Sequence, residues 1–419
     1  MSESKKLSSC DDYDPHSLNV DQARERILES VATVGGFERL ALRSALDRVL
    51  AEDVVSTIDV PAYTNSAMDG YAVLAGDLPQ QGSVTLTMIG TALAGAPLHQ
   101  TMSSGQCVRI MTGAKMPDGA DTVIMQEHVA REGDAITVTA GHKPGQNVRQ
   151  AGEDLARGGC VFRAGARLTP ADIGMLASLG MAEVVVHRRV RAAFFSTGDE
   201  LRSIGETLGD GQIYDSNRYT LYGMLTRLGV ELLDMGVIPD RRDAIESAFK
   251  TASALADVLI TSGGVSVGEA DYVKETLEKI GEVNFWKIAM KPGRPLAFGR
   301  IGDCHFFGLP GNPVSAMVTF YQFVQPALLR MMGLPAVEPL YLQLPCVSEL
   351  RKAPGRVEFQ RGIMEADDTG RLVVRSTGKQ GSGMLNSMGK ANCFIILPMD
   401  VAKVEVGNVV TVQPFAGLV

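Results

Sequence analysis

The chain has 419 residues, of which 45% are hydrophobic and 21% are charged. These fractions are ordinary for globular proteins, and the length is too great for one small domain, so both a disordered chain and a single module are excluded. The formal net charge of −8 argues against general nucleic-acid binding. The six cysteines show no CxxC spacing. We therefore expect reduced thiols in a cytoplasmic protein rather than a zinc site.

Residues 1–16 are polar and contain no apolar run, so we expect a disordered tail and no signal peptide. Residues 308–329 carry no charge and are long enough to span a membrane. That run also contains Asn312, two glutamines and three prolines. A core helix after a loop is the better interpretation, and we expect no membrane association.

The next segments predict a mixed domain interrupted by a β insertion. Apolar residues at Val20, Ala23, Ile27 and Val31 have helical spacing, and residues 38–46 continue as a second amphipathic piece. Residues 72–150 hold short alternating runs between glycine turns, which predicts an all-β insertion domain over residues 57–152. Residues 17–56 and 153–188 then form one mixed domain, with a helix that starts after Thr169.

Strands and helices alternate from residue 189 to residue 335. That alternation predicts a doubly wound, mainly parallel sheet in an α/β domain. Residues 336–419 return to short strands and predict a small C-terminal β domain resembling a barrel. The predicted fold class is therefore a multidomain α/β protein with a central α/β domain, an all-β insertion, an N-terminal mixed domain and a C-terminal β domain.

Chemistry-bearing residues follow four predicted strands of the α/β domain. The residues at these strand ends include Glu200, Asp240, the glycine-rich run 262–271 and Pro310. Because ligands bind beyond the carboxyl ends of parallel strands, the four ends together predict a site. The glycine loop lacks both familiar nucleotide fingerprints, but bare amides before a helix can hold phosphate.

Each of these acids has an ordinary alternative role. Asp271 opens a helix and fits a cap as well as a ligand. Glu200 could be a solvated loop acid, and Asp215-Ser216-Asn217 could be only a helix cap. Carboxylates that converge beside a phosphate loop suit Mg²⁺, for which we consider Glu200, Asp240 and Asp271.

Cations and further turns complete the list of candidates. Lys287, Lys291 and Arg294 flank a proline-glycine bend, which favours an oxyanion ligand, although a solvated strand edge is the common alternative. Asn312-Pro313, with Ser315 in the same turn, fits helix initiation or an anion-binding N-terminus equally well. In the β insertion, the segments 65–71 and 109–114 would by themselves be ordinary turns.

Nine segments in matching order resemble the MoeA-type molybdopterin molybdenumtransferases and the related E domain of gephyrin. They are PAYTNSAMDGYAV (61–73), RIMTGAKMP (109–117), GQNVRQAGEDL (145–155), FFSTGDEL (194–201), DGQIYDSNR (210–218), TSGGVSVGEADYVK (261–274), MKPGRPLAFG (290–299), GLPGNPVSAMVTFYQFVQP (308–326) and PGRVEFQRG (354–362). The resemblance covers essentially everything after the first twenty residues. It implies insertion of molybdate into adenylylated molybdopterin with release of AMP, assisted by Mg²⁺.

The resemblance also implies roles for individual residues. Asp240 and Asp271 would act at the metal and the phosphates, with Glu200 nearby. Asp69 and Thr112 would reach the site from the β insertion of the second chain of a homodimer, in which residues 17–56 and 153–188 take part in dimerisation. Substrate-binding residues would be Gly263, Gly264, Ser266, Lys291, Arg294, Pro310, Pro313, Ser315, Arg361 and Ser382. Of these, Lys291, Arg294, Ser315, Arg361 and Ser382 would form the molybdate pocket.

The chain departs from the family pattern in places. Arg294 stands where many relatives have lysine, which changes the geometry of an oxyanion contact. Thr64 replaces a frequent aspartate. The glycine loop reads GGVS where adenylyltransferases that charge molybdopterin usually read GGTG. This difference argues against adenylyl transfer, which remains an alternative, as does a non-catalytic scaffold like gephyrin. An adenylyltransferase that delivers the substrate is a possible partner.

Overall fold

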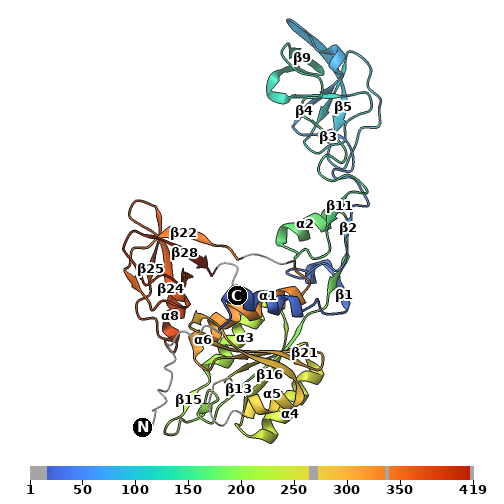
Figure 1. The fold of residues 1–419 in the computed structure, drawn as a ribbon. Helices are drawn as coiled ribbons and strands as arrows, with labels where there is room; N and C mark the ends of the chain where they lie inside the picture. The colour runs from blue at the N-terminus through green and yellow to red at the C-terminus, as the bar shows by residue number, and fades with distance from the viewer. Residues whose placement is uncertain (1–16, 264–271, 336–338, 416–419) are drawn as a thin grey trace, which may run out of the picture. The chain divides into compact units, whose positions relative to one another are not determined.

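The computed structural model describes residues 17–263, 272–335 and 339–415. The chain divides into two compact units, Met1–Glu38 with His187–Val419, and Arg39–Val186 (Figure 1). The predicted tail 1–16 lies outside the described residues. Multidomain α/β content is therefore present as predicted.

The unit Arg39–Val186 contains an all-β region with a six-stranded sheet in the order β7-β4-β6-β5-β9-β8. Its strands are β4 (Gly70–Val73), β5 (Ser83–Ala92), β6 (Gln106–Ile110), β7 (Thr122–Met125), β8 (Val129–Glu132) and β9 (Ala135–Thr139). Neighbouring residues of β4 alternate between two cores, since Ala72 packs in one and Tyr71 and Val73 pack in the other. Alternating burial is what the period of a strand requires.

Smaller elements of this unit form a separate core. The strand pairs are β2 (Val54–Val55) with β11 (Cys160–Phe162), and β3 (Asn65–Ser66) with β10 (Val148–Arg149). Helix α2 (Pro170–Ser178) begins as predicted, because Thr169 and Asp172 form a reciprocal capping box before Pro170. Leu176 of α2 packs with Leu50, with Val54 of β2, and with Val186 of β12 (Glu183–His187).

The expectation of a helix across residues 38–46 is wrong. Residues Phe37–Ala41 form strand β1, and Leu42–Ser44 form a single turn of 3₁₀ helix. Exposure alternates along β1, and Leu40 and Leu42 pack against the same core two residues apart. A period of two is typical of a strand. The spacing of Leu40 and Leu42 was therefore a better guide to the structure than the helical spacing of apolar residues over the longer segment.

In the other unit, α1 (Val20–Ser30) agrees with its prediction, with Val20, Ala23 and Ile27 buried. A six-stranded sheet follows in the order β16-β13-β17-β21-β20-β18. The strands are β13 (Arg191–Thr197), β16 (Glu231–Ile238), β17 (Val258–Ser262), β18 (Glu282–Lys287), β20 (Pro295–Ile301) and β21 (Cys304–Leu309). Strands β16, β13, β17 and β21 are mutually parallel, while β20 and β18 are antiparallel.

Helices cover both faces of this sheet (Figure 1). On one face, α4 (Arg242–Leu255) and α5 (Tyr272–Ile280) pack through Phe249 and Leu277 against Phe195 and Phe306. On the other face lie α3 (Ser216–Leu228) and α6 (Pro313–Thr319). A stretch of π-helix, Phe320–Val324, joins α6 to α7 (Gln325–Met331), so the uncharged run 308–329 is largely a buried helix. No helix in the described ranges is long and apolar enough to cross a membrane.

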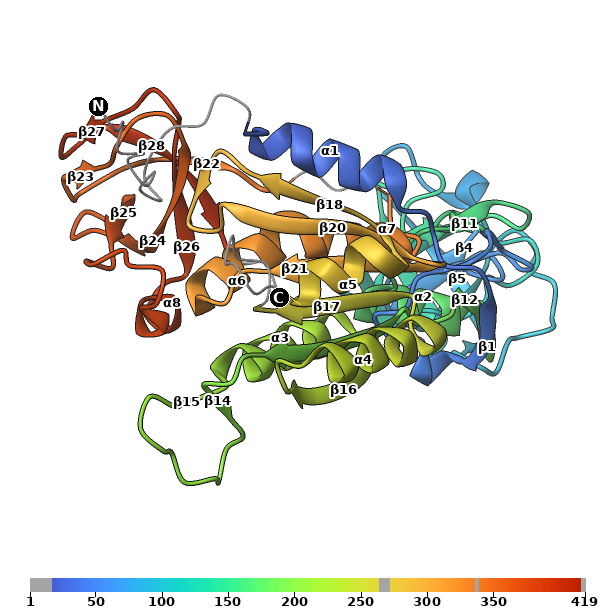
Figure 2. The ribbon, with the colours of Figure 1, turned by 60° about the horizontal axis from the view of Figure 1, so that its bottom comes forward.

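The C-terminal part is a β-sheet in the order β19-β24-β26-β28-β22, with β25 paired to β24. Its strands are β19 (Met290–Lys291), β22 (Leu342–Pro345), β24 (Val357–Ala366), β25 (Leu372–Ser376), β26 (Cys393–Leu397) and β28 (Val409–Pro414), with α8 (Leu385–Lys390) beside it. Short strand pairs β14 (Leu201–Arg202) with β15 (Ile213–Tyr214), and β23 (Leu350–Arg351) with β27 (Lys403–Val404), complete the unit. In Figure 2 this sheet, in red, lies at the end of the α/β sheet where α6 begins.

Candidate functional site

Four strand ends share one edge of the α/β sheet, as predicted. The parallel registers place Thr197 beside Ile238, Ser196 beside Ser262, and Ser262 beside Leu309. Segments that follow these residues, with Glu200, Asp240, Gly263 and Pro310, therefore leave the sheet together. Since β16 lies on one side of β13 and β17 on the other, the topological switch point lies between β13 and β17. This is where open α/β sheets bind ligands.

Backbone packs against backbone at this switch point. Gly263 has a φ of +91°, and a Cβ there would lie 2.6 Å from the carbonyl oxygen of Thr197. Its amide donates to the carbonyl of Leu309 at 3.1 Å, and Gly311 lies next to its Cα. Only glycine fits such an approach. Gly264, Ser266 and Asp271 lie outside the described residues, so their predicted roles stay predictions.

The start of α3 adds polar groups that the sequence analysis regarded mainly as a helix cap. Asp215 does cap α3, since its Oδ1 accepts from the Arg218 amide. The side-chain Nδ2 of Asn217 donates to Ser262 Oγ at 2.8 Å and to the Gly311 carbonyl at 2.7 Å. Asn217 thereby joins the end of β17 to the turn after β21. Polar residues at the ends of apolar strands were the signal that could have identified Ser262.

Several buried oxygens near this edge lack a hydrogen-bond partner within the described residues. They are Ser196 Oγ, Thr197 Oγ1, Thr261 Oγ1, Asp215 Oδ2 and Asn217 Oδ1. Buried polar atoms are normally satisfied by protein or by ordered water. Five such atoms around one switch point are therefore consistent with a polar ligand, and all five of their residues were missing from the predicted site.

The acidic candidates are electrostatically coupled. Partial burial raises the pKa of Asp240, and the negative charges of Asp199 and Glu200 raise it further. The Glu200 carboxylate lies against Gly198, where a Cβ would be 2.6 Å from its Oε2. A divalent cation would relieve this repulsion, and oxygen ligands suit Mg²⁺. No group of three or more His, Cys, Asp or Glu side chains among residues 17–263, 272–335 and 339–415 is placed to hold a metal ion.

The cationic candidates gather where α6 meets the C-terminal sheet. A Cβ on Gly293 would lie 2.6 Å from Thr319 Oγ1 and 3.4 Å from the carbonyl of Ser315, so the bend between Lys291 and Arg294 contacts α6. The amide of Val314 donates to the carbonyl of Ser382 at 3.0 Å. The structure therefore brings the bend, Ser315 and Ser382 together.

Arg361 completes this cluster from β24. Its Nη2 donates to the carbonyl of Gly381 at 3.1 Å, and its Nε donates to Ser387 Oγ at 3.0 Å. The side chain is only 1% exposed, and burial lowers the pKa of Arg361 to about 10. A guanidinium held this way beside Ser382 is suited to a charge-assisted hydrogen bond to an oxyanion. Lys291, Arg294, Ser315, Ser382 and Arg361 are thus neighbours through a chain of contacts.

The turn at residues 309–315 links the two groups. Pro310 accepts from Ser262 Oγ at 3.5 Å, whereas Val314 contacts the Ser382 segment. Pro313 is the first residue of α6, as predicted, but Asn312 makes no side-chain capping hydrogen bond.

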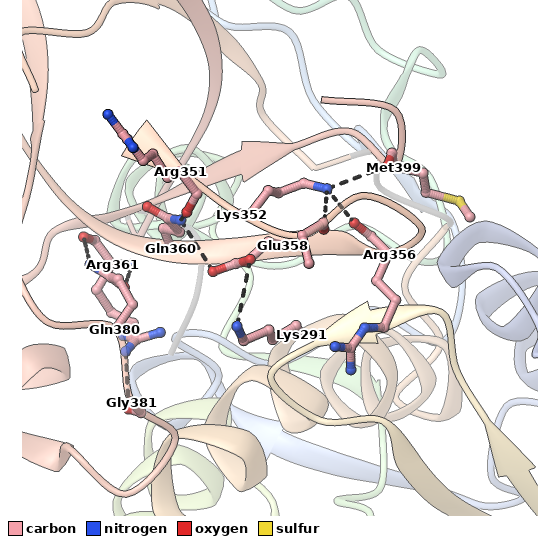
Figure 3. A network of polar contacts seen from close by, with 11 residues as sticks. Lys291, Arg351, Lys352, Arg356, Glu358, Gln360, Arg361, Gln380, Gly381 and Met399 are labelled. Carbon is pink, nitrogen blue, oxygen red and sulfur yellow. Dashed lines mark hydrogen bonds and ion pairs between the residues drawn. The ribbon is translucent and has the colours of Figure 1, made fainter. Parts of the chain in front are cut away.

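A polar network lies beside Arg361 in β24 (Figure 3). Glu358 is 5% exposed and forms an ion pair with Lys291 at 4.0 Å. Gln360 donates to Glu358 Oε1 at 3.1 Å. Lys352 donates to the carbonyls of Arg356 and Met399 at 2.8 and 3.4 Å. None of Lys352, Glu358 and Gln360 was identified from the sequence, because no local pattern indicates that β19 pairs with β24.

Asp69 and Thr112 belong to the other unit and are in contact there. The Thr112 amide and hydroxyl both donate to Asp69 Oδ1 at 2.8 Å. These two hydrogen bonds hold the pKa of Asp69 below its usual range, and the one from the Thr112 amide has the larger effect. The two suspected turns are thus joined through hydrogen bonds to one carboxylate.

Fold and candidate site together define a multidomain α/β protein with a candidate anion site at a topological switch point. Three family models match in chain order: the MoeA N-terminal region, domains I and II (18–180), a probable molybdopterin binding domain (193–330), and the MoeA C-terminal region, domain IV (343–415). A molybdopterin molybdenumtransferase of Haemophilus influenzae is 48% identical over 400 residues, which is 95% of this chain and 98% of that protein. The chain therefore belongs to the molybdopterin molybdenumtransferase family, as the resemblance indicated.

Two further similarities agree with this assignment. The crystal structure of a molybdopterin biosynthesis moeA protein from Pyrococcus horikoshii superimposes with a TM-score of 0.83 at 31% identity, covering 95% of this chain and all of that one. Gephyrin of Dictyostelium discoideum is 34% identical over 443 residues, covering 93% of this chain and 61% of that protein.

Proposed function

We propose that this protein is a transferase of molybdenum cofactor biosynthesis that inserts molybdate into adenylylated molybdopterin and releases AMP. The observation that carries the proposal is the turn at residues 309–315. It contacts both the glycine-lined strand ends and the cluster of Lys291, Ser315, Ser382 and Arg361. A phosphate-rich substrate on one side of this turn and an oxyanion on the other would be held next to each other.

The residues present suit this chemistry. Amides that follow Gly263 in the glycine loop would hold phosphate oxygens, and Asn217 ties the end of β17, where that loop begins, to the turn after β21. Mg²⁺ held by Glu200, Asp240 and Asp271 would neutralise the phosphoanhydride. Arg361 and Lys291 would hold molybdate through charge-assisted hydrogen bonds. Water would attack the phosphorus on the pterin side, the bond from that phosphorus to the bridging oxygen would break, and AMP would leave with the bond's electron pair. The two dithiolene sulfurs would bind molybdenum as they lose their protons, and these protons would leave with one molybdate oxygen as water. Catalysis then rests on positioning and electrostatics, because no protein nucleophile is needed.

The proposal includes an assembly and a location. We propose a homodimer in which Asp69 and Thr112 of one chain serve the site of the other, in the cytoplasm, with a molybdopterin adenylyltransferase as a partner that delivers substrate. Adenylyl transfer itself and a scaffold role are the alternatives. The similarity to gephyrin supports the scaffold alternative.

The test uses the purified full chain with adenylylated molybdopterin, Mg²⁺ and molybdate. We expect AMP release that depends on both molybdate and Mg²⁺, and little release when sulfate replaces molybdate. Formation of the adenylylated substrate from ATP and molybdopterin would instead indicate adenylyl transfer. A folded protein that releases no AMP under any of these conditions would exclude the proposed reaction and leave the scaffold.

A further inference from the structure

A buried acid beside the cluster of Lys291, Ser315, Ser382 and Arg361, which we propose binds an oxyanion, requires an explanation. Glu358 is 5% exposed, and its side chain is close to Arg361 and Lys352, because its charge affects the pKa of both. A carboxylate repels an anionic substrate, so direct contact with molybdate is not its role. Burying a carboxylate is costly unless cations and hydrogen bonds compensate. The function of Glu358 must therefore involve the cations around it.

The register between two strands points to one of those cations. Strand β19 runs parallel to β24, with Lys291 paired to Glu358 and Met290 paired to Val357. The amide of Val357 also donates to the carbonyl of Ala289 at 2.9 Å. The backbone thus fixes the two residues side by side, although they are far apart in the sequence (Figure 3).

The two side chains differ in freedom. The Lys291 side chain is 44% exposed, and lysine has a flexible stem with a point charge at its end. The Glu358 side chain is 7% exposed and is fixed by the hydrogen bond from Gln360. A rigid carboxylate beside a mobile ammonium limits where that ammonium can go.

We propose that Glu358 is a positioning residue, whose carboxylate, fixed by Gln360, holds the Lys291 ammonium in the cluster with Ser315, Ser382 and Arg361. This inference rests on the proposed function, because it assigns molybdate to that cluster. Glu358 does not touch substrate and acts through Lys291. Its removal should therefore weaken the use of molybdate and leave the binding of the adenylylated pterin unchanged.

The first test compares Glu358→Gln with Glu365→Gln. Both glutamates lie on β24 and both form ion pairs, but Glu365 pairs with Arg375 on the exposed surface at 2.6 Å. For Glu358→Gln we expect the KM for molybdate to rise about fivefold, which corresponds to one weak ion pair, with kcat and affinity for the adenylylated pterin near the wild-type values. Glu365→Gln should change none of the three. An unchanged or lower KM in Glu358→Gln would overturn the proposal.

A double-mutant cycle tests whether Glu358 acts through Lys291. In a Lys291→Ala background, Glu358→Gln should add no further increase in KM. A full additional increase would mean that Glu358 acts on Arg361 or Lys352 instead, and the proposal would be wrong. If Glu358→Gln does not fold, Glu358→Asp provides the same cycle, because it keeps the charge and withdraws it by one methylene. We expect a smaller rise in KM there, and the proposal fails if there is none.

Equilibrium dialysis with molybdate alone distinguishes failure of the proposed function from failure of the proposal for Glu358. If wild-type protein binds molybdate without turnover, the proposed reaction fails, and the ratio of dissociation constants for Glu358→Gln and wild type still tests Glu358. If wild-type protein turns over but the two glutamine variants behave alike, only the Glu358 inference fails. If wild-type protein neither binds molybdate nor uses it, both are refuted.

Discussion

Adding one methyl group at Gly263 tests how closely the strand ends approach at the switch point. In Gly263→Ala, the new Cβ would lie 2.6 Å from the backbone oxygen of Thr197, which is held in the sheet and cannot move aside. The φ of +91° adds strain of about 1–2 kcal/mol for a non-glycine residue. Overpacking typically costs about 1–3 kcal/mol. We therefore expect Gly263→Ala to lower the free energy of unfolding by about 2–5 kcal/mol.

Gly302 offers a matched control in the same sheet. It lies in the turn between β20 and β21 with a φ of +59°, and a Cβ there would meet nothing within 4 Å. Gly302→Ala should cost only the backbone strain, about 1–2 kcal/mol. Urea unfolding can be followed by the fluorescence of the single tryptophan, Trp286, in β18 of that sheet. Equal losses in the two variants would refute the collision with Thr197.

The same variant should also impair the proposed reaction. A displaced backbone at Gly263 should weaken the binding of the adenylylated pterin, whereas molybdate binding on the other side of the 309–315 turn should change little. Separate measurements of the two affinities check this, with Gly302→Ala as the control. Selective loss of molybdate binding in Gly263→Ala would contradict the assignment of phosphate to the strand ends.

Three further predictions concern charges. Thr112→Ala should raise the pKa of Asp69 towards its usual value, because one of two hydrogen bonds is lost, and Thr112→Ser should restore it; an NMR titration of the carboxylate measures both. Burial would raise the pKa of Asp257, but hydrogen bonds led by Arg188 hold it below its usual range. Asp257→Asn should therefore lower the free energy of unfolding by about 1–3 kcal/mol at pH 7. Urea titrations should show this difference vanishing as the pH falls below about 4, through the folded pKa. In a purified mixed dimer of Asp69→Ala and Asp271→Ala, one site carries both defects and the other neither, so about half of the AMP release should return; no recovery would mean that both residues serve the same chain.

The sequence predicted local features best where a single strand or helix determines them. The strand ends at Thr197, Ser262 and Leu309 could be located from apolar runs, and their common edge followed from the parallel βαβ pattern. The cap at Thr169 was equally local. By contrast, residues 38–46 were assigned to a helix because their apolar spacing allowed it, and pairing between strands decided otherwise.

Parts of the candidate site depend on contacts that no local pattern contains. The antiparallel strand β20 limits the number of parallel strands, and it begins at Pro295, in a segment noticed for its charges and its family resemblance but not predicted as a strand. The role of Glu358 could not be predicted from the sequence for a similar reason, because its partner Lys291 comes from a distant segment. The roles of Asp271 and Ser266 depend on residues outside the described ranges and remain predictions.

Strand β19 has a consequence for exchanging parts between relatives. The C-terminal sheet takes its edge strand from residues Met290–Lys291, which precede α6 in the chain. A chimera that swaps residues 339–415 would import β24 from one parent and keep β19 from the other. Residues 291 and 358, which face each other, would then come from different parents. A fragment beginning at residue 339 would lack β19 and would expose the edge of β24 to pairing with other chains. Productive crossovers should therefore carry residues 288–293 along with the C-terminal sheet.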